Sequence, residues 1–516
     1  MANFTVSPGV SLNEIDNTFL TSEPVQAGAA IVGPTVKGPI ETPVKVTSYS
    51  EYVTMFGDVI ESGSQNYSYL TSIAAHNYFN YGGESLLVTR VASGSFTSAT
   101  SSFISGANEA NCITLETISE GTIMNTGTHG TGGALSTGTK DNVRWEVTTH
   151  NTQSGTFNLL IRQGNDITNK KIILESFNNL SMDPNSENYV AKVIGDQKLS
   201  YDSVNNQITT TGDYRNNSRY VRVKSVNNPT PNYLDANGTP VTAFTGSIPK
   251  PASGSFGAAT GIPFASRAGN FYQNIDSTDA QGLEGANYDT AIKLLSNKED
   301  YKFNVLFTPG LIGANSSAQT NKIIQNTQER GDNLYVHDLV NYGSTVTTAV
   351  GRAGAIDNSY AATYWPWVRI SDPATGKLVF VPASTMIPGV YAFNDKVAAP
   401  WFAPAGINRG GLNTVVSAEY KLTQANRDAL YEANINPIAT LPQQGVVVYG
   451  QKTLQKDASA LDRVNVRRLL IELKSFIGQI AETLVFEQNT AVTRGTFLTR
   501  VNPYLEKIQQ KQGLYA

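Results

Sequence analysis

The sequence predicts a mixed α/β (α+β) protein of several domains, and three observations carry that prediction. Short apolar runs alternate with helix-period segments at 28–95 and again at 266–395, the order expected of a partly parallel sheet. Residues 96–265 are rich in Ser, Thr and Gly and hold several β-like runs. Two long amphipathic helical patterns lie within 396–516. At about 150 residues per domain, a chain of 516 residues accommodates three or four domains.

Residues 1–27 are predicted to form an extended arm. Apolar residues alternate with polar ones after a Pro-Gly pair, which is the two-residue period of a strand. Because a strand this short cannot bury its apolar side alone, it needs to pair with another sheet edge, from its own chain or from a neighbouring molecule. An ordinary first strand of a domain is the alternative. The residues assigned to an inter-subunit arm are Pro8, Gly9, Val10, Leu12 and Ile15.

An α/β region is predicted from two stretches, 28–95 and 266–395, taken together. In the first stretch we expect strands at 30–32, 44–46 and 86–91, a helix from about 50 to Gly57, and a helix over 69–79. In the second we expect helices at 287–295 and 317–330 and strands at 303–307 and 334–339. Strands and helices alternating at this spacing imply right-handed crossovers.

The segment 96–265 is predicted to be a largely β insertion on the outside of the molecule. Its β-like runs lie at 144–149, 157–162, 171–174 and 220–226. One helix is expected to interrupt them, with Asp183 as its N-cap, Pro184 in its first turn and Gly195 as its stop.

The C-terminal region, 396–516, is predicted to hold a strand at 446–449 and helices at 462–487 and 493–510, each with one apolar face. Four basic side chains lie on or beside the first of these helices. They form either a solvated face or a cationic contact for an acidic protein partner. The four residues are Arg463, Arg467, Arg468 and Lys474.

Composition excludes several classes of partner. Charged residues make up 16% of the chain and the net charge is −4, so no basic field exists to collect nucleic acid or an acidic membrane surface. No apolar run approaches the ~18–20 residues of a membrane span, and the first residues do not resemble a secretory signal. Cys112 is the only cysteine, which excludes an internal disulfide framework and a multi-cysteine zinc site.

No catalytic, cofactor-binding or metal-binding residues are predicted. The four histidines show no His-x-x-x-His pair. Ser371 to Lys377 resembles a phosphate loop but lacks the first glycine, and Leu378 stands where Ser or Thr would hold magnesium. We interpret this segment as a hairpin turn around Asp372 and the glycine tract at 127–138 as a surface loop.

Several segments, in order, resemble the tail sheath proteins of contractile-tailed (myovirus-type) bacteriophages. They read SPGVSLNEID in the arm, AAIVGPTVKGPIETPVKVTSYSEYVTMFG at 29–57, NLSMDPNSENYVAKVIGDQ at 179–197, FAPAGINRG at 402–410, RDALYEANINP at 427–437, VVVYGQKTL at 446–454, LDRVNVRRLLIELKSFIG at 461–478 and FEQNTAVTRGTFLTRVNPYLEKIQQKQGLYA at 486–516. The resemblance is dense from about 400 onward and clear in the first 60 residues. It is patchy between about 93 and 280.

The resemblance implies a structural protein rather than an enzyme. Sheath subunits form hexameric rings stacked in a helix around a tail tube, with an inner domain built from both chain ends, outer insertions, and terminal arms that add strands to neighbouring subunits. On a baseplate signal the sheath shortens and drives the tube through the host envelope for genome ejection. The implied partners are further copies of the chain, the tail tube protein, and baseplate and tail terminator proteins, without nucleic acid or direct membrane insertion. The implied location is the virion, after synthesis in the host cytoplasm.

The resemblance also implies a strand-bearing tail beyond the position of Ala516. Three other interpretations stay open from the sequence: the sheath of a related non-viral contractile injection system, a surface adhesin or glycan-binding protein built on 96–265, and a hydrolase using carboxylates that the sequence cannot pair.

Overall fold

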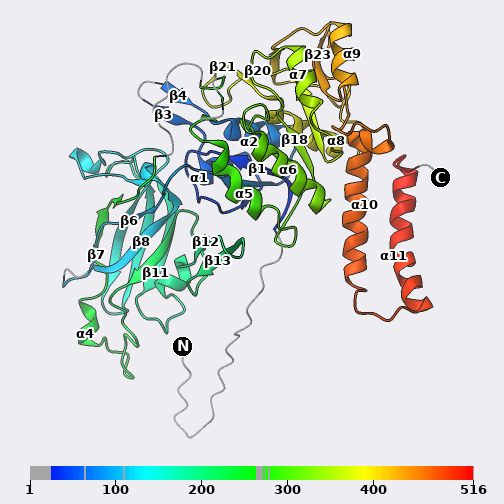
Figure 1. The fold of residues 1–516 in the computed structure, drawn as a ribbon. Helices are drawn as coiled ribbons and strands as arrows, with labels where there is room; N and C mark the ends of the chain where they lie inside the picture. Colours follow the sequence, from blue (N-terminus) through cyan, green and yellow to red (C-terminus); the bar gives the residue numbers. More distant parts are fainter. Residues whose placement is uncertain are drawn as a thin grey trace.

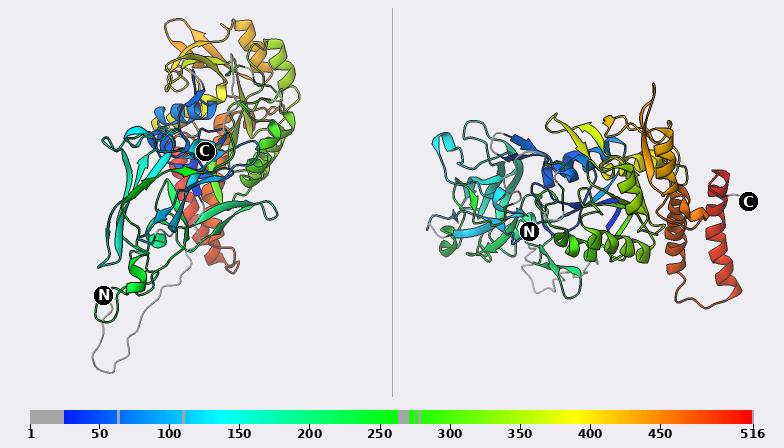
Figure 2. Two further views of the ribbon diagram at one scale, coloured as in Figure 1. Left: turned by 90° about the vertical axis from the view of Figure 1, so that its left-hand side faces the viewer. Right: turned by 45° about the horizontal axis from the view of Figure 1, so that its top comes forward.

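The computed structural model describes residues 25–62, 65–108, 111–262, 271–273, 275–276 and 279–514. They form an α/β body around one large sheet, a β-rich lobe, and a pair of long C-terminal helices (Figure 1). The lobe and the helix pair lie at opposite ends of the body (Figure 2, right). The arm residues named above, from Pro8 to Ile15, lie outside the described residues.

Eight strands form the central sheet, in the order β2-β5-β1-β17-β18-β19-β23-β24. In that order the strands are β2 (Val44–Val46), β5 (Leu86–Arg90), β1 (Val25–Gly33), β17 (Tyr301–Phe307), β18 (Leu334–His337), β19 (Ala361–Trp365), β23 (Asn436–Leu441) and β24 (Gly445–Val448). Neighbours from β5 to β23 are parallel, and only the edge strands β2 and β24 pair antiparallel. The prediction of a partly parallel sheet is confirmed. β1 begins at Val25, inside the range that the sequence assigned to the arm.

Helices cover both faces of this sheet. One face carries α1 (Tyr49–Phe56), α2 (Leu70–Asn80) and α8 (Ile387–Val397), and the other carries α5 (Asp289–Leu294), which follows the 3₁₀ turn η3 (Gly285–Tyr288), α6 (Ser317–Arg330), α7 (Val346–Ala353) and α9 (Gln424–Glu432). The chain supplies local start and stop signals for them. Ser48 Oγ accepts a hydrogen bond from the Glu51 amide at the start of α1, and Gly331, at φ 70°, ends α6 in a left-handed conformation.

Several predicted elements agree closely with the structure. α6 has the predicted bounds, and the predicted strands at 44–46, 86–91 and 303–307 correspond to β2, β5 and β17. The segment resembling a phosphate loop is the predicted hairpin turn: β20 (Val368–Ser371) and β21 (Leu378–Val381) pair antiparallel, and the Asp372 side chain accepts from the Ala374 amide. β22 (Val415–Ala418) is the third strand of this small sheet. The 3₁₀ turn η4 (Ala383–Thr385) follows β21 in the chain. A further hairpin joins β3 (Ile60–Ser62) to β4 (Gln65–Tyr67).

The β-rich lobe lies between β5 and β17 in sequence and has a hydrophobic core of its own. Its strands are β6 (Ser98–Ser101), β7 (Ile104–Ser105), β8 (Asn111–Glu120), β9 (Val143–Asn151), β10 (Thr156–Gln163), β11 (Ile173–Ser181), β12 (Lys198–Asp202), β13 (Gln207–Thr211), β14 (Val221–Val226), β15 (Ala252–Gly254) and β16 (Phe256–Gly257). Its helical turns are η1 (Thr122–Met124), η2 (Thr131–Gly133), α3 (Val190–Ile194) and α4 (Thr242–Thr245). The glycine tract at 127–138 contains η2 and an isolated bridge between His129 and Leu135.

The predicted start of the helix in the lobe is wrong. Asp183 does not cap α3, because its carboxylate accepts from the Asn185 amide within a turn, 2.9 Å away. The helix begins only at Val190 and is five residues long. An Asp-Pro pair is typical both of a helix N-terminus and of a turn. Here the Asp183 side chain stabilises the turn.

Buried charges join the lobe to the body. The Lys37 ammonium lies 3.4 Å from the Asp141 carboxylate, with both side chains at least nine-tenths buried. The more exposed Lys140 pairs with Asp58 at 2.7 Å. Because a buried ion pair is costly to break by removing one member, the first contact fixes where the lobe meets the body.

Candidate assembly surface

The described residues contain no group of three or more His, Cys, Asp or Glu side chains placed to hold a metal ion. None of the helices in the described ranges has the length and apolar content needed to cross a bilayer. His76 packs edge-on against the Tyr49 ring, 4.8 Å between centroids. The feature of the surface that differs most from the rest is the C-terminal helix pair.

The helix pair is an antiparallel hairpin of α10 (Val464–Glu482) and α11 (Ala491–Gln510), preceded by the turn η5 (Ala460–Asp462). At 1.5 Å per residue each helix is about 30 Å long, and the hairpin projects from the body (Figures 1 and 2). The apolar stripes of the two helices meet, with the Phe476 and Tyr504 rings stacked 3.7 Å apart. Its own buried core is small and consists of Leu469, Leu473 and Ile508.

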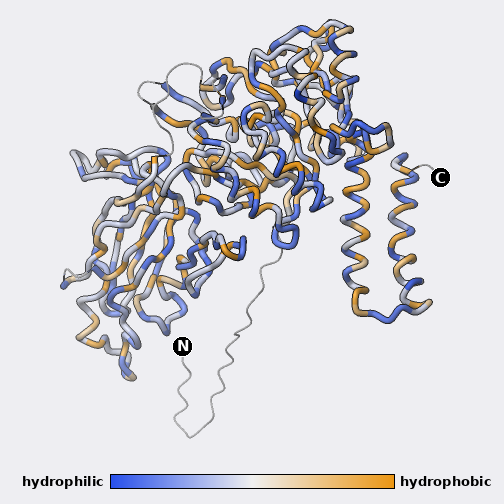
Figure 3. The backbone as a smooth tube through the Cα atoms, viewed as in Figure 1, coloured by the Kyte–Doolittle hydropathy of each residue, from blue (hydrophilic) through white to orange (hydrophobic). Residues whose placement is uncertain are grey.

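The tip of the hairpin exposes large apolar side chains. Phe486 is 101% exposed, Val485 65% and Val492 78%, and Leu498 on α11 is 52% exposed. Apolar residues recur along both helices to this end (Figure 3). We call these four residues the apolar tip. Val485, Phe486 and Val492 lie in or next to the connection between the two helices. Clustered exposed apolar residues mark an interaction site more often than scattered ones do.

The root of the hairpin is held by a buried arginine. Arg468 is 5% exposed, and its guanidinium forms two hydrogen bonds with the Asp395 carboxylate on α8, one of them 2.9 Å long. It also lies over the Tyr391 ring, 4.7 Å from the centroid. Burial alone would lower the pKa of Arg468, but Asp395 more than offsets it and the pKa is raised. Arg468 is therefore a structural anchor.

The other three predicted basic residues also contact the chain itself. Arg467, 5% exposed, hydrogen-bonds to Ser359 and lies 4.0 Å above the Tyr360 ring. The Lys474 ammonium reaches the Tyr360 hydroxyl at 3.2 Å. Arg463 hydrogen-bonds to the Tyr431 hydroxyl and pairs with Asp462.

The predicted basic face therefore needs correction. Arg467 and Arg468 are neither solvated nor directed at a partner, because the tyrosines and the carboxylate that they contact lie in the body of the same chain. Lys474 alone of the four is exposed. Sequence reasoning missed Asp395 and Tyr360 as their partners, since neither lies near α10 in the chain.

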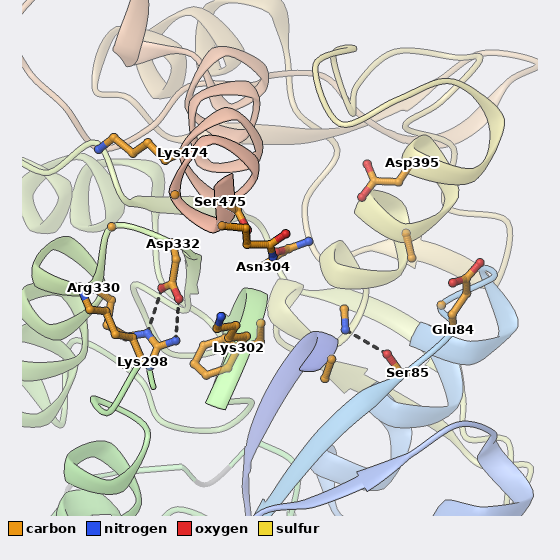
Figure 4. A pocket seen from close by; sticks show the side chains of 18 of the residues that line it. Glu84, Ser85, Lys298, Lys302, Asn304, Arg330, Asp332, Asp395, Lys474 and Ser475 are labelled. Carbon is orange, nitrogen blue, oxygen red and sulfur yellow. Dashed lines mark hydrogen bonds and ion pairs between the residues drawn. The ribbon is translucent and has the colours of Figure 1, made fainter. Parts of the chain in front are cut away.

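A cleft of about 1260 Å³ separates the outer half of α10 from the body. Figure 4 shows Lys474 and Ser475 on α10, with Lys298, Lys302 and Asp332 across the space. The floor is the amino-terminal end of the parallel strands, where Ala27 and Gly28 of β1 line the cleft. Charges of both signs line it, and Arg330 pairs with Asp332 at 2.8 Å. Residues 1–24, which are most of the predicted arm 1–27, precede β1 in the chain and lie outside the described residues.

The apolar tip was not predicted as a site, although the sequence contains a signal for it. The periodicity predicted the first helix to continue to 487, with Leu484 on its inner face. The helix ends at Glu482 instead, so Val485 and Phe486 fall in the connection. An apolar Leu-Val-Phe run between two helices, where turn residues are expected, is the signal that could have identified it.

Comparison with known proteins is informative at this point. Residues 281–454, about a third of the chain, match the family described as phage tail sheath protein central domain. Over this segment the chain is similar to phage tail sheath proteins. The tail sheath protein of Vibrio phage KVP40 is 40% identical over 160 residues, which is 31% of this chain and 23% of that protein. The tail sheath protein of Enterobacteria phage T4 is 35% identical over 180 residues, or 35% of this chain and 27% of that protein.

The matched segments thus span only about a quarter of the length of these two curated relatives. Among solved structures, the crystal structure of a sheath tail protein from Listeria innocua has a TM-score of 0.55 at 9% identity, covering 94% of this chain and 85% of that one. This likeness shows a shared fold. The matched 281–454 segment contains β17, β18, β19, β23 and β24 of the central sheet and ends ten residues before α10. These matches confirm the resemblance to tail sheath proteins noted in the sequence.

Proposed function

We propose that this chain is the subunit of a contractile phage tail sheath. Subunits assemble as hexameric rings stacked helically around a tail tube and shorten to drive the tube through the host envelope for genome ejection. The observation that carries the proposal is the apolar tip, because it is an unpartnered surface on a chain that contains a sheath central domain. In a helical polymer each subunit meets further copies through head-to-tail contacts that never close, so every copy needs such surfaces.

The geometry supports a division of work within the subunit. The body buries its sheet on both faces and is complete in one chain. The hairpin is anchored at its root through Arg467 and Arg468 and carries the apolar tip away from the body. A rigid body with an anchored projecting element suits rings that rotate as units while contacts between copies persist.

The arm, residues 1–27, is proposed to add a strand to a neighbouring copy by β-augmentation. The tail tube, baseplate and tail terminator proteins are proposed as further partners, and the virion as the place of action. No step of this mechanism requires bound nucleotide, because energy stored at assembly can be released from a kinetically trapped state.

Electron microscopy of the purified protein tests the proposal. We expect hollow helical tubes or stacked rings from the unmodified chain. Val485→Ser/Phe486→Ser should abolish them while the monomer keeps its thermal midpoint. The control is Val204→Ser, which removes a valine from the lobe that is 84% exposed, compared with 65% for Val485. Tubes that form from the tip variant at the same concentration would show that the tip is not an assembly surface.

A deletion tests the arm separately. Removing residues 2–20 should leave a folded, soluble monomer that no longer polymerises. Tubes from this variant at unchanged concentration would contradict a linking role for the arm.

A further inference from the structure

A second, smaller cavity lies on the opposite edge of the central sheet from the cleft. It has a volume of about 220 Å³ and is lined by Pro34 and Thr35, which follow β1, and by Arg90 to Ser93 at the end of β5. These are the carboxyl ends of parallel strands. β1 is also the strand at which the order of the sheet reverses, since β5 lies on one side of it and β17 on the other. Open α/β sheets bind ligands at this edge, next to such a reversal.

A buried arginine lines this cavity. Arg90 is 1% exposed, and its Nη1 donates to the carbonyl oxygens of Gly38 and Glu120, at 2.6 and 2.9 Å. Its Nε has no hydrogen-bond acceptor. The nearby Glu120 carboxylate is engaged elsewhere, by the Ile40 amide at 3.2 Å, and forms no ion pair with Arg90. Within the described ranges, Arg90 thus has no carboxylate within ion-pair distance, although the negative charge of Glu120 acts to raise the Arg90 pKa.

The other buried arginines show what is missing. Within the described chain, five of the seven buried arginines pair with a carboxylate, and Arg467 instead lies on the Tyr360 ring and hydrogen-bonds to Ser359. The five paired residues are Arg144, Arg162, Arg222, Arg330 and Arg468. A buried charge without its partner is costly. Arg90 therefore lacks the carboxylate that these five arginines contact, and a bound anion would supply it.

The rest of the cavity determines what kind of anion fits. Part of the wall is apolar: Pro34, Val91 and Leu283 line it, and the Phe96 ring lies 5.4 Å from the Arg90 guanidinium. The polar side chains, apart from Arg90, are the hydroxyls of Thr35 and Ser93. One cation beside an apolar part of the wall suits a ligand with a single charged group and a small apolar body, because such a site buries the body and orients the charge.

We propose that this cavity binds a carboxylate attached to a small apolar body, with Arg90 as its counter-ion. The guanidinium would hydrogen-bond to the carboxylate through the donors that its carbonyl contacts leave free. Burial lowers the pKa of Arg90 to about 10, so the side chain remains charged at neutral pH. This inference goes beyond the proposed sheath function and does not depend on it.

Three small probes test the site on the full chain by isothermal titration calorimetry at constant ionic strength. Benzoate carries both the charge and the body, benzyl alcohol only the body, and acetate only the charge. We expect benzoate to bind at least about tenfold more tightly than either of the others, since a charge-assisted hydrogen bond contributes ~1.5–3 kcal/mol. Equal binding of benzyl alcohol and benzoate would overturn the proposal, as would the absence of benzoate binding.

Two variants locate the binding. Arg90→Met should remove the preference for benzoate over benzyl alcohol. Because Arg90 also supports the backbone, a second variant keeps it: Ala92→Phe should fill the cavity and abolish binding of all three probes. The control Ser95→Phe adds the same ring at an exposed position that does not line the cavity, and it should leave binding unchanged. Retained benzoate binding in Ala92→Phe would overturn the proposal.

The carboxylate could come from a free metabolite or from an acidic side chain of another copy of the chain. Benzoate added during assembly separates these sources. If benzoate raises the protein concentration needed to form tubes, benzoate competes with an acidic side chain of a second copy for the cavity. Unchanged assembly alongside tight benzoate binding identifies a free ligand, and both outcomes support the site itself.

Discussion

The central sheet and the C-terminal hairpin both carry large apolar side chains but differ in how much of each side chain they bury. Phe307 on β17 is 0% exposed, whereas Phe486 at the tip is 101% exposed. The sheet is covered by helices on both faces, so one chain completes its core. A two-helix hairpin has no third layer and can bury only the stripe between its helices. The comparison indicates that the body buries its own core, whereas the outer part of the hairpin leaves large apolar side chains exposed.

The largest effect is expected when a phenylalanine is replaced by alanine in each of the two regions and the free energies of unfolding are compared. Phe307→Ala should lower the free energy of unfolding by ~3–5 kcal/mol, because it removes a fully buried ring and leaves a cavity. Phe486→Ala should leave the free energy of unfolding of the monomer unchanged and weaken self-association. Urea denaturation at a concentration below assembly measures the first quantity, and sedimentation measures the second. A large loss of monomer stability in Phe486→Ala would break the comparison.

The next largest effect concerns the joint between the two regions. Asp395→Ala should cost ~3 kcal/mol, because it leaves the buried Arg468 guanidinium without its carboxylate. Limited proteolysis should then cleave the hairpin before the body. The control is Glu187→Ala, which breaks an exposed ion pair with Lys192 in the lobe and should leave the thermal midpoint unchanged. Equal effects of the two substitutions would mean that the hairpin is not held through Asp395.

A pH-dependent effect distinguishes the sheet from the hairpin. Asp338, at the end of β18, is buried, and its carboxylate accepts from the Ser384 hydroxyl and amide. Burial raises the pKa of Asp338 to about 7, from 3.8. Between these two values the folded state holds a proton that the unfolded state has lost, so stability falls as the pH rises and is constant above the folded value.

Between pH 5 and pH 7 we expect a loss of about 2 kcal/mol from this group, since each pH unit contributes at most ~1.4 kcal/mol. Asp338→Asn mimics the protonated form and should flatten the profile of the body. The rate at which a protease cleaves the hairpin should not follow this dependence on pH. An unchanged slope in Asp338→Asn would place the titrating group elsewhere.

The sequence predicted the sheet better than the hairpin for a physical reason. Strands such as Phe303–Phe307 and helices such as Ser317–Arg330 carry their periodicity and their stop signals locally, so their bounds could be read from the chain. The roles of Arg467 and Arg468 could not, because their partners Tyr360 and Asp395 are more than 70 residues away in sequence and only the fold brings them to α10. Exposure of a charged helix face is decided by such long-range contacts.

The candidate surfaces show the same limit. The apolar pattern of α10 and α11 predicted that each helix has an inward face. It did not predict that the outer half of the hairpin leaves part of this face exposed, as Leu498 shows. The Arg90 cavity had no sequence signal at all, since Thr35, Arg90 and Leu283 are joined only by the strand order.

The smallest expected effect sharpens the role of the hairpin. Gly478 lies inside α10 and faces the cleft, and nothing lies within 4 Å of the position where a Cβ would stand. Gly478→Ala should stabilise the helix by ~0.5–1 kcal/mol, because glycine costs backbone entropy within a helix. Hydrogen exchange of α10 amides should slow by about two- to fivefold.

In the described residues, no close contact requires a glycine at position 478. A residue without a side chain permits close approach of another backbone. If Gly478→Ala slows exchange and also impairs assembly, the cleft face of α10 is covered in the polymer as well as the tip. If assembly is unaffected, the hairpin meets its partner through the apolar tip alone. The control Gly495→Ala, in open space on α11, should stabilise its helix to a similar degree and leave assembly unchanged.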